Sequence, residues 1–287
     1  IVHCHSPIGG VIARLASRNV RKEGTKVVYT AHGFHFFKGA SLLNWLIFYP
    51  IEKICSRMTD VLITINQEDY VRAKSWNTCH VECVAGIGVH TADFRNEKVD
   101  RKLYRDNFGF KDDDFVFMST GQLSVRKNHE VIIRAIAEIK NPKVKYLMVG
   151  FGELEERHKN LVKELEIEDR VIFAGYRGDV KQLLHVVDGF VFPSLQEGLP
   201  VALMEAMSVG LPIVCSKIRG NIDLIENGKG GFLYECHDVQ GFADGMKKIV
   251  SGDCPYMGKI NIETMKNFDV EAVNEHMNHL YSDLLNS

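Results

Sequence analysis

Short apolar runs alternate with longer amphipathic runs along the whole chain, and this pattern is typical of parallel sheets joined by helical crossovers. In the first part of the chain, the pattern predicts strands at 1–5, 27–30, 61–65 and 81–84. It predicts helices near 9–22, 40–58 and 67–76. Asn66 can cap the last of these helices, with Asp69 as an acidic residue in its first turn.

The periodicity lapses at 86–94, and a polar stretch follows to about 114, so we place a domain boundary between 94 and 95. Further strands are predicted at 115–119, 146–149, 171–174, 189–193, 213–215 and 231–234. Helices fill the gaps, near 128–140, 153–166, 178–187, 200–209, 219–226 and 238–250. The region 95–267 therefore predicts a complete doubly wound sheet, which binds ligands at the carboxyl ends of its strands.

The two ends of the chain differ in character. The segment 268–287 has apolar residues at helical spacing and predicts one helix. The run 1–5 reads as a buried strand with nothing before it, and a domain rarely begins in mid-strand. We therefore expect the first domain, 1–94, to lack an N-terminal part, which would leave a strand edge exposed.

Composition narrows the class of protein. The 287 residues suffice for two domains with separate cores, and a net charge of -2 without a basic block argues against nucleic acid as a partner. Seven scattered cysteines and no secretory segment indicate a reducing cytosol. Cys79 and Cys83 lack a second Cys/His pair, so we expect buried thiols and no metal site.

The longest apolar run is 42–49, followed by Pro50. It is too short to span a bilayer, which takes about 20 apolar residues. Two interpretations stay open. The favoured one is a helix that faces the core, and the other is a helix that touches a membrane surface or an apolar acceptor.

The segment 194–207 carries the most informative chemistry. A loop with Glu197 follows the apolar strand at 190–192, and Pro200 opens a helix that carries Glu205. The free N–H groups at the start of such a helix suit an anion such as a phosphate, and the two carboxylates can accept hydrogen bonds from sugar hydroxyls. A surface helix with an acidic first turn is the alternative.

This segment resembles the E-x7-E signature of the retaining glycosyltransferases of family 4. The resemblance implies an α/β fold with two Rossmann-like domains facing across a cleft (GT-B type), of which the first is truncated here, and a C-terminal helix, 268–287, that crosses back to the first domain. It implies that Glu197 contacts the donor sugar and that Glu205 contacts the ribose hydroxyls of a nucleotide-sugar. The backbone of this donor site would come from Gly198, Leu199, Pro200 and Val201.

A second segment, 120–128, resembles the family pattern G-R-L-x-x-x-K-G. Gly121, Leu123 and Lys127 match it, whereas Gln122 stands for the usual Arg and Asn128 for the usual Gly. The resemblance implies that Lys127 binds the pyrophosphate, and Arg126 can supply the missing charge. A solvated Arg-Lys turn is the alternative.

Three further segments resemble parts of the family's donor site. In Gly175–Gly178, Tyr176 or Arg177 would stack on the nucleotide base, an ordinary loop being the alternative. Gly150–Gly152 is expected to serve packing more than phosphate binding. Arg219–Asn221 is expected to shape the sugar pocket, with packing alone as the alternative.

The first domain adds histidines at its strand ends. The resemblance implies that His32 reaches the donor sugar, with His35 in reserve. His3 and His5 share one face of a strand, where two metal ligands are conceivable. No carboxylate cluster accompanies them, so a role in lining the cleft is favoured.

The function implied is transfer of a hexose-type sugar from a nucleoside diphosphate donor, with uridine as the expected base, to a hydroxyl of a saccharide or lipid-linked acceptor. Retention of configuration, a place in capsule or exopolysaccharide synthesis, and no cofactor or metal are part of this implication. The catalytic residues would be Glu197, His32 and Lys127, with the diphosphate charge stabilised by Lys127, Arg126 and the helix start. The protein would be cytoplasmic, with membrane contact at the inner face of the cell membrane as a further expectation. A sugar-nucleotide 2-epimerase and an inactive nucleotide-sugar-binding fragment are the alternatives.

Overall fold

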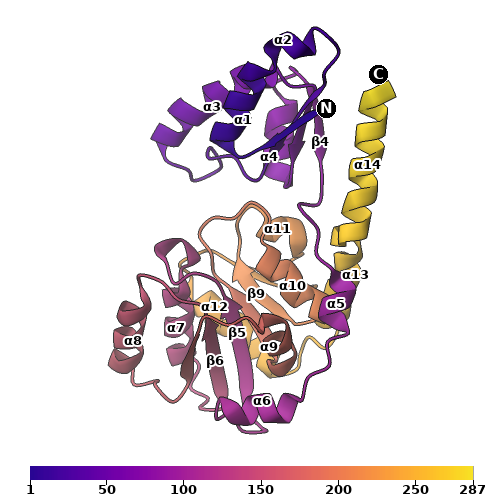
Figure 1. The fold of residues 1–287 in the computed structure, drawn as a ribbon. Helices are drawn as coiled ribbons and strands as arrows, with labels where there is room; N and C mark the ends of the chain where they lie inside the picture. Colours follow the sequence, from indigo (N-terminus) through magenta and orange to yellow (C-terminus); the bar gives the residue numbers. More distant parts are fainter. Residues whose placement is uncertain (287) are drawn as a thin grey trace. The chain divides into compact units, whose positions relative to one another are not determined.

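The computed structural model describes residues 1–286, which divide into two compact units (Figure 1). The first consists of Ile1–Gly88 and the described part of Asn267–Ser287, and the second of Val89–Lys266. The units part a few residues before the boundary expected at 94. The reason is that α5 (Thr91–Arg95) packs against α10 (Val201–Val209) of the second unit.

The sheet of the first unit is parallel, with the order β1-β2-β3-β4. Its strands are β1 (Val2–His5), β2 (Val27–Ala31), β3 (Val61–Thr64) and β4 (His80–Cys83). Every residue of β2 and β3 is buried, as expected for parallel strands covered on both faces. Alternate residues point to opposite faces, so Tyr29 and Leu62 join one core cluster while Val28 and Ile63 join the other.

Five helices belong to this unit, namely α1 (Pro7–Ala16), α2 (Arg18–Arg21), α3 (Leu42–Ser56), α4 (Gln67–Lys74) and α14 (Val270–Asn286). Asn66 caps α4 as predicted, because its side chain accepts a hydrogen bond from the N–H of Asp69. Cys79 and Cys83 are both partly exposed, so the prediction that they are buried thiols is wrong.

A buried ion pair joins α1 to α3. Arg14 Nη2 donates to Glu52 Oε2 over 2.9 Å, and the Tyr29 hydroxyl donates to Glu52 Oε1 over 3.0 Å. Both charged side chains are almost fully buried, which is tolerated because each has its partner. The two helices therefore face each other through a polar contact.

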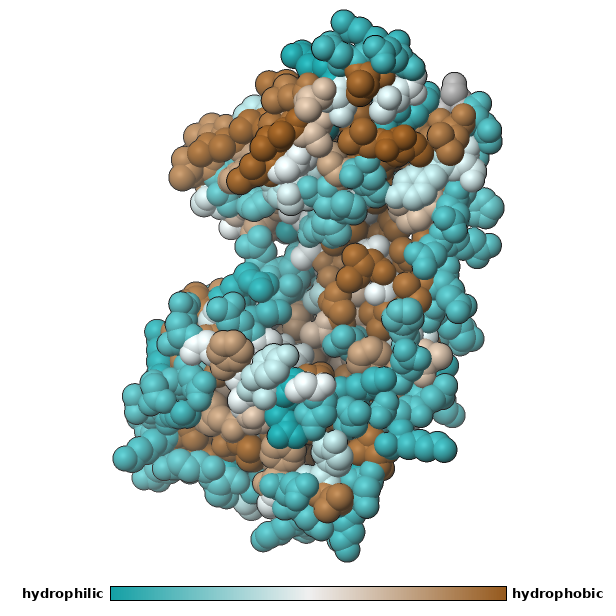
Figure 2. All heavy atoms as spheres, viewed as in Figure 1, coloured by the Kyte–Doolittle hydropathy of each residue, from teal (hydrophilic) through white to brown (hydrophobic). Residues whose placement is uncertain are grey.

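The outer face of α3 is exposed, so the favoured interpretation of 42–49 as facing the core is wrong for this face. Leu43 and Leu46 are 64% and 66% exposed (Figure 2). The inner face does pack, because Trp45, Phe48 and Tyr49 lie against the buried aromatic cluster of the unit. Pro50 lies inside α3, and the helix continues beyond it to Ser56.

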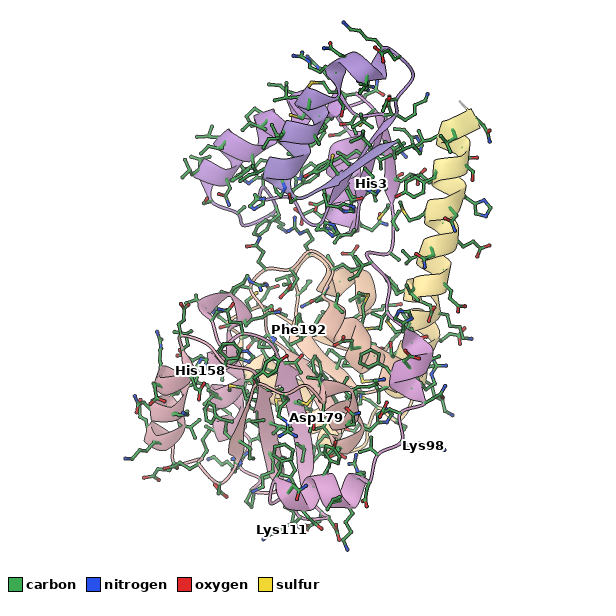
Figure 3. All side chains as sticks on the ribbon, in the orientation of Figure 1. His3, Lys98, Lys111, His158, Asp179 and Phe192 are labelled. Carbon is green, nitrogen blue, oxygen red and sulfur yellow. The ribbon has the colours of Figure 1, made fainter. Side chains whose placement is uncertain are left out.

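Helix α14 completes the core on the other face of the first sheet. Its Val273 and Leu280 are buried against Val28, Val61 and Ile63. A hydrogen bond of 2.5 Å joins the Tyr281 hydroxyl to Nδ1 of His3, which is labelled in Figure 3. The predicted C-terminal helix is thus a structural member of the first unit.

The second unit holds a six-stranded parallel sheet with the order β10-β9-β8-β5-β6-β7. The strands are β5 (Phe115–Thr120), β6 (Val144–Val149), β7 (Val171–Gly175), β8 (Gly189–Phe192), β9 (Ile213–Ser216) and β10 (Gly231–Tyr234). This confirms the predicted doubly wound sheet. The chain runs from β5 outward to β7 and then returns to β8 on the other side of β5, so the switch point lies between β5 and β8.

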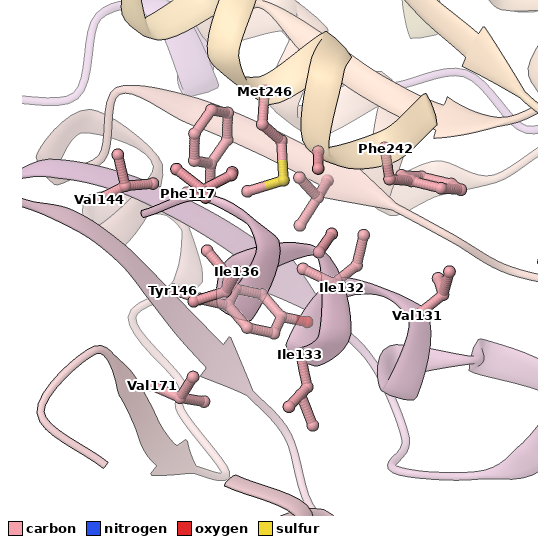
Figure 4. Packing of buried hydrophobic residues seen from close by; sticks show 14 of the residues in the cluster. Phe117, Val131, Ile132, Ile133, Ile136, Val144, Tyr146, Val171, Phe242 and Met246 are labelled. Carbon is pink, nitrogen blue, oxygen red and sulfur yellow. The ribbon is translucent and has the colours of Figure 1, made fainter. Parts of the chain in front are cut away.

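Helices cover both faces of this sheet, and the predicted ones among them are α7 (His129–Glu138), α8 (Glu155–Glu164), α9 (Val180–Val186), α10, α11 (Asn221–Leu224) and α12 (Val239–Val250). Figure 4 shows isoleucines of α7 packed between Phe242 and Met246 of α12 and the side chains of the strands. This apolar core fixes the strand ends that carry the candidate site.

Three helices have no counterpart in the prediction: α5, α6 (Arg101–Asn107) and α13 (Met257–Met265). Helix α6 lies in the polar stretch that follows 86–94, where the pattern predicts no helix. It is fixed by Arg105, whose buried guanidinium donates to the carbonyls of Asp114 and Val186. A hydropathy pattern shows no signal for a contact of this kind, because a buried arginine counts as polar.

Candidate functional site

The loops that follow β5 and β8 lie together at the switch point of the second unit. The Leu195 N–H donates to the carbonyl of Arg126 over 2.8 Å. The Asn128 side chain donates to the carbonyl of Pro193 over 3.1 Å. The structure thus brings together the two segments that the sequence singled out separately.

Three predicted site residues meet in one cluster of charges, which we call the charge cluster. Lys127 Nζ lies 2.8 Å and Arg126 Nη1 lies 3.0 Å from the same oxygen, Oε1 of Glu197. Lys127 and Glu197 are only 13% and 12% exposed, whereas Arg126 is 49% exposed. Two cations against one carboxylate leave an excess of positive charge, which suits an additional anion.

The ring of Phe192, which is labelled in Figure 3, lies against Lys127 of the charge cluster. Lys127 Nζ lies 4.7 Å from the centre of the Phe192 ring, a cation–π contact. The ring stands at the end of β8, directly before the loop that carries Glu197. The apolar run 190–192 predicts Phe192 only as a residue of a buried strand, because contact between its ring and Lys127 has no local sequence signal.

The departure from the family pattern at Asn128 has a structural reason. Asn128 adopts the left-handed conformation with φ 54°, which Gly favours and Asn tolerates better than most residues. Its side-chain amide also donates to the carbonyl of Cys236 over 2.7 Å. The replacement therefore keeps the turn and adds a hydrogen bond. Gln122 carries no charge, and Arg126 takes the second cationic place in the charge cluster.

The turn after β9 holds the backbone of Glu197 and Gly198. Arg219 is buried, and its Nε donates to the carbonyl of Glu197 over 3.1 Å. Gly220 has φ +84°, and a Cβ there would lie 2.5 Å from the carbonyl oxygen of Gly198. Only glycine permits this approach. The turn is thus built to place the loop, and its role toward a sugar stays a prediction.

The start of α10 differs slightly from the prediction. Pro200 is the N-cap residue, and the helix begins at Val201. The expected place of Pro200 at the first helical position is therefore wrong by one residue. Leu199 is buried beside it. The N–H groups of the first turn stay directed along the helix axis toward the loop, as at any helix start.

Glu205 lies on α10 in a half-buried position. Burial raises the pKa of its carboxyl group above the ordinary value. Within residues 1–286, no hydrogen bond or ion pair reaches its side chain. A desolvated carboxylate without a donor is costly for stability, so a ligand that donates hydroxyl groups is a fitting partner.

The raised pKa of Glu205 leads to a stability prediction. The folded protein favours the protonated form, so the cost of the charged carboxylate appears as the pH rises through the folded pKa. Glu205→Gln removes the charge. We expect the melting temperature of the variant to exceed that of the parent chain by a few degrees at neutral pH. Thermal unfolding across pH 4 to 8 checks this, and a variant that is less stable at neutral pH would contradict the assigned cost.

A pocket of about 390 Å³ opens beside the charge cluster at the ends of β5, β6 and β7. Gly121, Gly150, Phe151 and Tyr176 are among its lining residues. The Phe151 and Tyr176 rings meet edge to face with centres 6.2 Å apart. Arg177 also lines this pocket, and its guanidinium donates to Asp179, labelled in Figure 3, over 2.6 and 2.8 Å. Both predicted stacking residues thus lie at the pocket, and the choice between them stays a prediction.

The predicted histidine, His32, belongs to the first unit and lies in a row of imidazoles. Its Nε2 lies 3.0 Å from His5 Nδ1, and the His5 ring stacks on His3. Burial and the nearby His5 lower the pKa of His32. Burial and both neighbouring imidazoles lower the pKa of His3 to about 4. His35 stacks on Phe48 instead.

The row of imidazoles does not extend to a metal site. Among residues 1–286, no group of three or more His, Cys, Asp or Glu side chains is arranged to hold a metal ion. The neutral form that the lowered pKa favours leaves these rings able both to donate and to accept hydrogen bonds. The role of His32 toward a donor sugar stays a prediction.

Comparison with known families decides the class of the protein. Residues 100–270 match the family model of the glycosyl transferases group 1, and residues 1–66 match that of the glycosyl transferase 4-like family. The chain belongs to the group 1 glycosyl transferases. The charge cluster, the switch point and Glu205 all fall inside the first of these matches.

Two relatives of this glycosyltransferase are bacterial proteins. One relative is EpsD of Bacillus subtilis, which is named as a putative glycosyltransferase. It is 38% identical over 98% of this chain and 76% of its own length. The Escherichia coli UDP-Gal:alpha-D-GlcNAc-diphosphoundecaprenol alpha-1,3-galactosyltransferase is 31% identical over 87% of this chain and 66% of its own length. The chain thus spans about two thirds to three quarters of these relatives.

Solved glycosyltransferase structures share the fold. Anabaena Alr3699/HepE in complex with UDP has a TM-score of 0.85 at 22% identity, covering 98% of this chain and 79% of its own. The apo form of the lipopolysaccharide outer core galactosyltransferase WaaB has a TM-score of 0.75 at 21% identity, covering 98% and 75%. The predicted α/β fold of GT-B type, with two Rossmann-like sheets, is confirmed.

Proposed function

We propose that this glycosyltransferase moves a hexose-type sugar from a nucleoside diphosphate donor to a hydroxyl of a saccharide or lipid-linked acceptor, in capsule or exopolysaccharide synthesis. The observation that carries the proposal is the charge cluster at the switch point, where Lys127 and Arg126 share Glu197. A diphosphate is the anion that a nucleotide-sugar brings to such a place. UDP is the favoured nucleotide, because the E. coli relative is named for UDP-Gal and a solved neighbour holds UDP.

Each part of the donor would contact a chemically suitable side chain near the switch point. The base would enter the pocket of about 390 Å³ and lie against Tyr176. The ribose hydroxyls would donate to the unpaired carboxylate of Glu205, which explains why a desolvated acid is kept there. The diphosphate would lie against Lys127 and Arg126, and the sugar against Glu197, whose backbone Arg219 holds.

The reaction requires charge stabilisation more than acid–base chemistry from the protein. When the bond between the anomeric carbon and the diphosphate breaks, negative charge grows on the leaving oxygen. Lys127, Arg126 and the N–H groups at the start of α10 would stabilise that charge. We infer front-face attack with retention, in which the acceptor hydroxyl passes its proton to the departing diphosphate. No metal or cofactor is needed for this proposal.

Calorimetric titration of the 287-residue chain with UDP, UDP-glucose, UDP-galactose and GDP tests the donor site. We expect saturable binding of UDP that falls by about 10-fold to 100-fold in Glu205→Ala, because charged hydrogen bonds to the ribose are lost. Glu153→Ala is the matched control, since Glu153 is a solvent-accessible carboxylate outside the charge cluster and the pocket. A folded chain that binds none of these nucleotides would overturn the proposed donor.

A further inference from the structure

The row of imidazoles in the first unit contains a hydrogen bond between two histidine side chains. His5 is the last residue of β1, and His32 follows directly after β2. The parallel pairing of these strands, in which His5 stands beside Thr30, brings the two histidines together. His5 Nδ1 lies 3.0 Å from His32 Nε2, and the two rings are inclined by 28°. Because either nitrogen can carry a proton or a lone pair, the bond requires one proton between them.

His3 holds the ring of His5 in place. The His3 ring stacks on His5 with centres 4.3 Å apart. Nδ1 of His3 is bonded to the Tyr281 hydroxyl of α14 over 2.5 Å, and its Nε2 to the Thr30 hydroxyl over 2.8 Å. With both nitrogens engaged, the His3 ring cannot turn without breaking a hydrogen bond. The orientation of His5 is therefore set by β1, β2 and α14 together.

The backbone next to His5 is strained. Ser6 has φ 63° and ψ 145°, a conformation that residues with a Cβ rarely adopt. Such strain costs on the order of 1–3 kcal/mol and gathers at functional sites. Ser6 is the N-cap residue of α1, but within residues 1–286 its side chain makes no capping hydrogen bond. Capping therefore does not explain the strain, which lies at the end of the strand that presents His5.

Each ring of the pair keeps one nitrogen for a partner outside the chain. Among the described residues, 1–286, no hydrogen-bond partner is found for Nε2 of His5 or Nδ1 of His32, and both residues are exposed. A neutral imidazole side chain carries its proton on Nε2 more often than on Nδ1. When both rings take this form, His32 Nε2–H donates to His5 Nδ1, and neither ring adopts its less stable tautomer. Nδ1 of His32 is then a lone pair, which accepts from a hydroxyl and repels a phosphate oxygen.

We propose that His5 is a positioning residue, which holds the proton of His32 on Nε2 and thereby makes Nδ1 of His32 the acceptor for a sugar hydroxyl. The class of the ligand atom rests on the proposed function, because a nucleotide-sugar and a saccharide acceptor both supply hydroxyls. The hydrogen bond between the two rings does not rest on it. His5 acts through His32 and touches no reacting atom.

Nuclear magnetic resonance of a chain labelled with nitrogen-15 at its histidines tests the hydrogen bond without any nucleotide. We expect a slowly exchanging proton on Nε2 of His32, with scalar coupling through the hydrogen bond to Nδ1 of His5. His5→Phe should abolish the coupling, since Phe keeps a ring to stack on His3 but has no acceptor. His279→Phe is the matched control, because His279 is an exposed histidine of α14 in the same unit. A proton on Nδ1 of His5, or no coupling in the folded parent chain, would overturn the proposal.

Transfer kinetics test what this hydrogen bond does for the reaction. His5→Phe should lower kcat by about tenfold to 100-fold with little change in the KM of the donor, because His32 is still present but no longer oriented. His5→Asn should keep most of the rate, since its side-chain oxygen lies near the position of Nδ1 and can accept the same proton. Circular dichroism verifies that both variants fold.

The outcomes separate this inference from the proposed function. A folded His5→Phe protein that turns over at the parent rate would overturn the positioning role, and so would a His5→Asn protein as slow as His5→Phe. If the parent chain turns over no nucleotide-sugar, the proposed function fails, and with it the sugar hydroxyl as the partner of His32. The coupling between the two rings then still decides whether His5 fixes the proton of His32.

Discussion

Replacing Lys127 with alanine should lower the rate of sugar transfer by about 100-fold or more, because removal of one preorganised charge from a developing oxyanion typically costs that much. Lys127 is largely buried, and its Nζ is fixed by Glu197 and the ring of Phe192. It therefore needs no rearrangement to meet a diphosphate. The measurement is the initial rate of sugar release or transfer from the donor that calorimetry identifies.

The control for this prediction is Lys143→Ala. Lys143 is a surface lysine paired with Asp113 before the amino-terminal ends of β5 and β6, whereas the charge cluster follows the carboxyl ends of β5 and β8, so its loss should leave the rate unchanged. Arg126→Ala should have a smaller effect than Lys127→Ala, because Arg126 is about half exposed and water screens its charge. A Lys127→Ala protein that folds and turns over at the parent rate would remove Lys127 from the reaction.

Gly150→Ala is expected to destabilise the second unit by about 3 kcal/mol or more, which places it among the largest single-residue effects. Gly150 has φ +140°, and a Cβ there would lie 1.9 Å from the carbonyl oxygen of Gly121. Neither backbone can move freely, because Gly121 N–H is bound to Val149 and Gly150 N–H to Gly175. Urea unfolding followed by circular dichroism gives the loss in free energy of unfolding.

Gly178→Ala is the matched control in the same unit. A Cβ at Gly178 would have no atom within 4 Å. Its free energy of unfolding should stay within about 1 kcal/mol of the parent value. If Gly150→Ala were as stable as Gly178→Ala, the tight approach of the β5 and β6 ends would be wrong. The experiment also bears on the site, since Gly121 precedes the loop that carries Lys127.

The regular elements could be predicted because their signals are local. The strands of the second unit are short apolar runs bounded by turn residues, and all six lie where the pattern placed them. The charge cluster was partly predictable, since the resemblance singled out Lys127, Arg126 and Glu197. Their meeting at one carboxylate oxygen follows from strand order, because β5 and β8 become neighbours only in the folded sheet.

The features that the sequence pattern did not predict have a common cause, which is that they depend on tertiary contacts. Hydropathy along 42–49 shows that α3 is apolar on all sides, but it does not show which side the rest of the unit covers. Helix α6 is not predicted by the hydropathy pattern, because the contacts that hold it in place are polar. Arg105 donates hydrogen bonds to the carbonyls of Val186 and Asp114, which lie outside the helix. The support of Lys127 by Phe192 is likewise set by tertiary neighbours. The local sequence pattern predicts whether a segment is a helix or a strand. The whole fold determines which part of the protein packs against each of its faces.

The first unit is assembled from both ends of the chain, and this has a consequence for its biosynthesis. Val28, Val61 and Ile63 are covered by Val273 and Leu280 of α14, which follow the entire second unit in the sequence. A ribosome adds about 5–20 residues per second, so this sheet face would wait on the order of tens of seconds for its cover. During that interval the second unit can fold while the nascent first sheet stays open. We therefore expect chaperones that act during translation to bind the residues of this sheet until α14 has been synthesised.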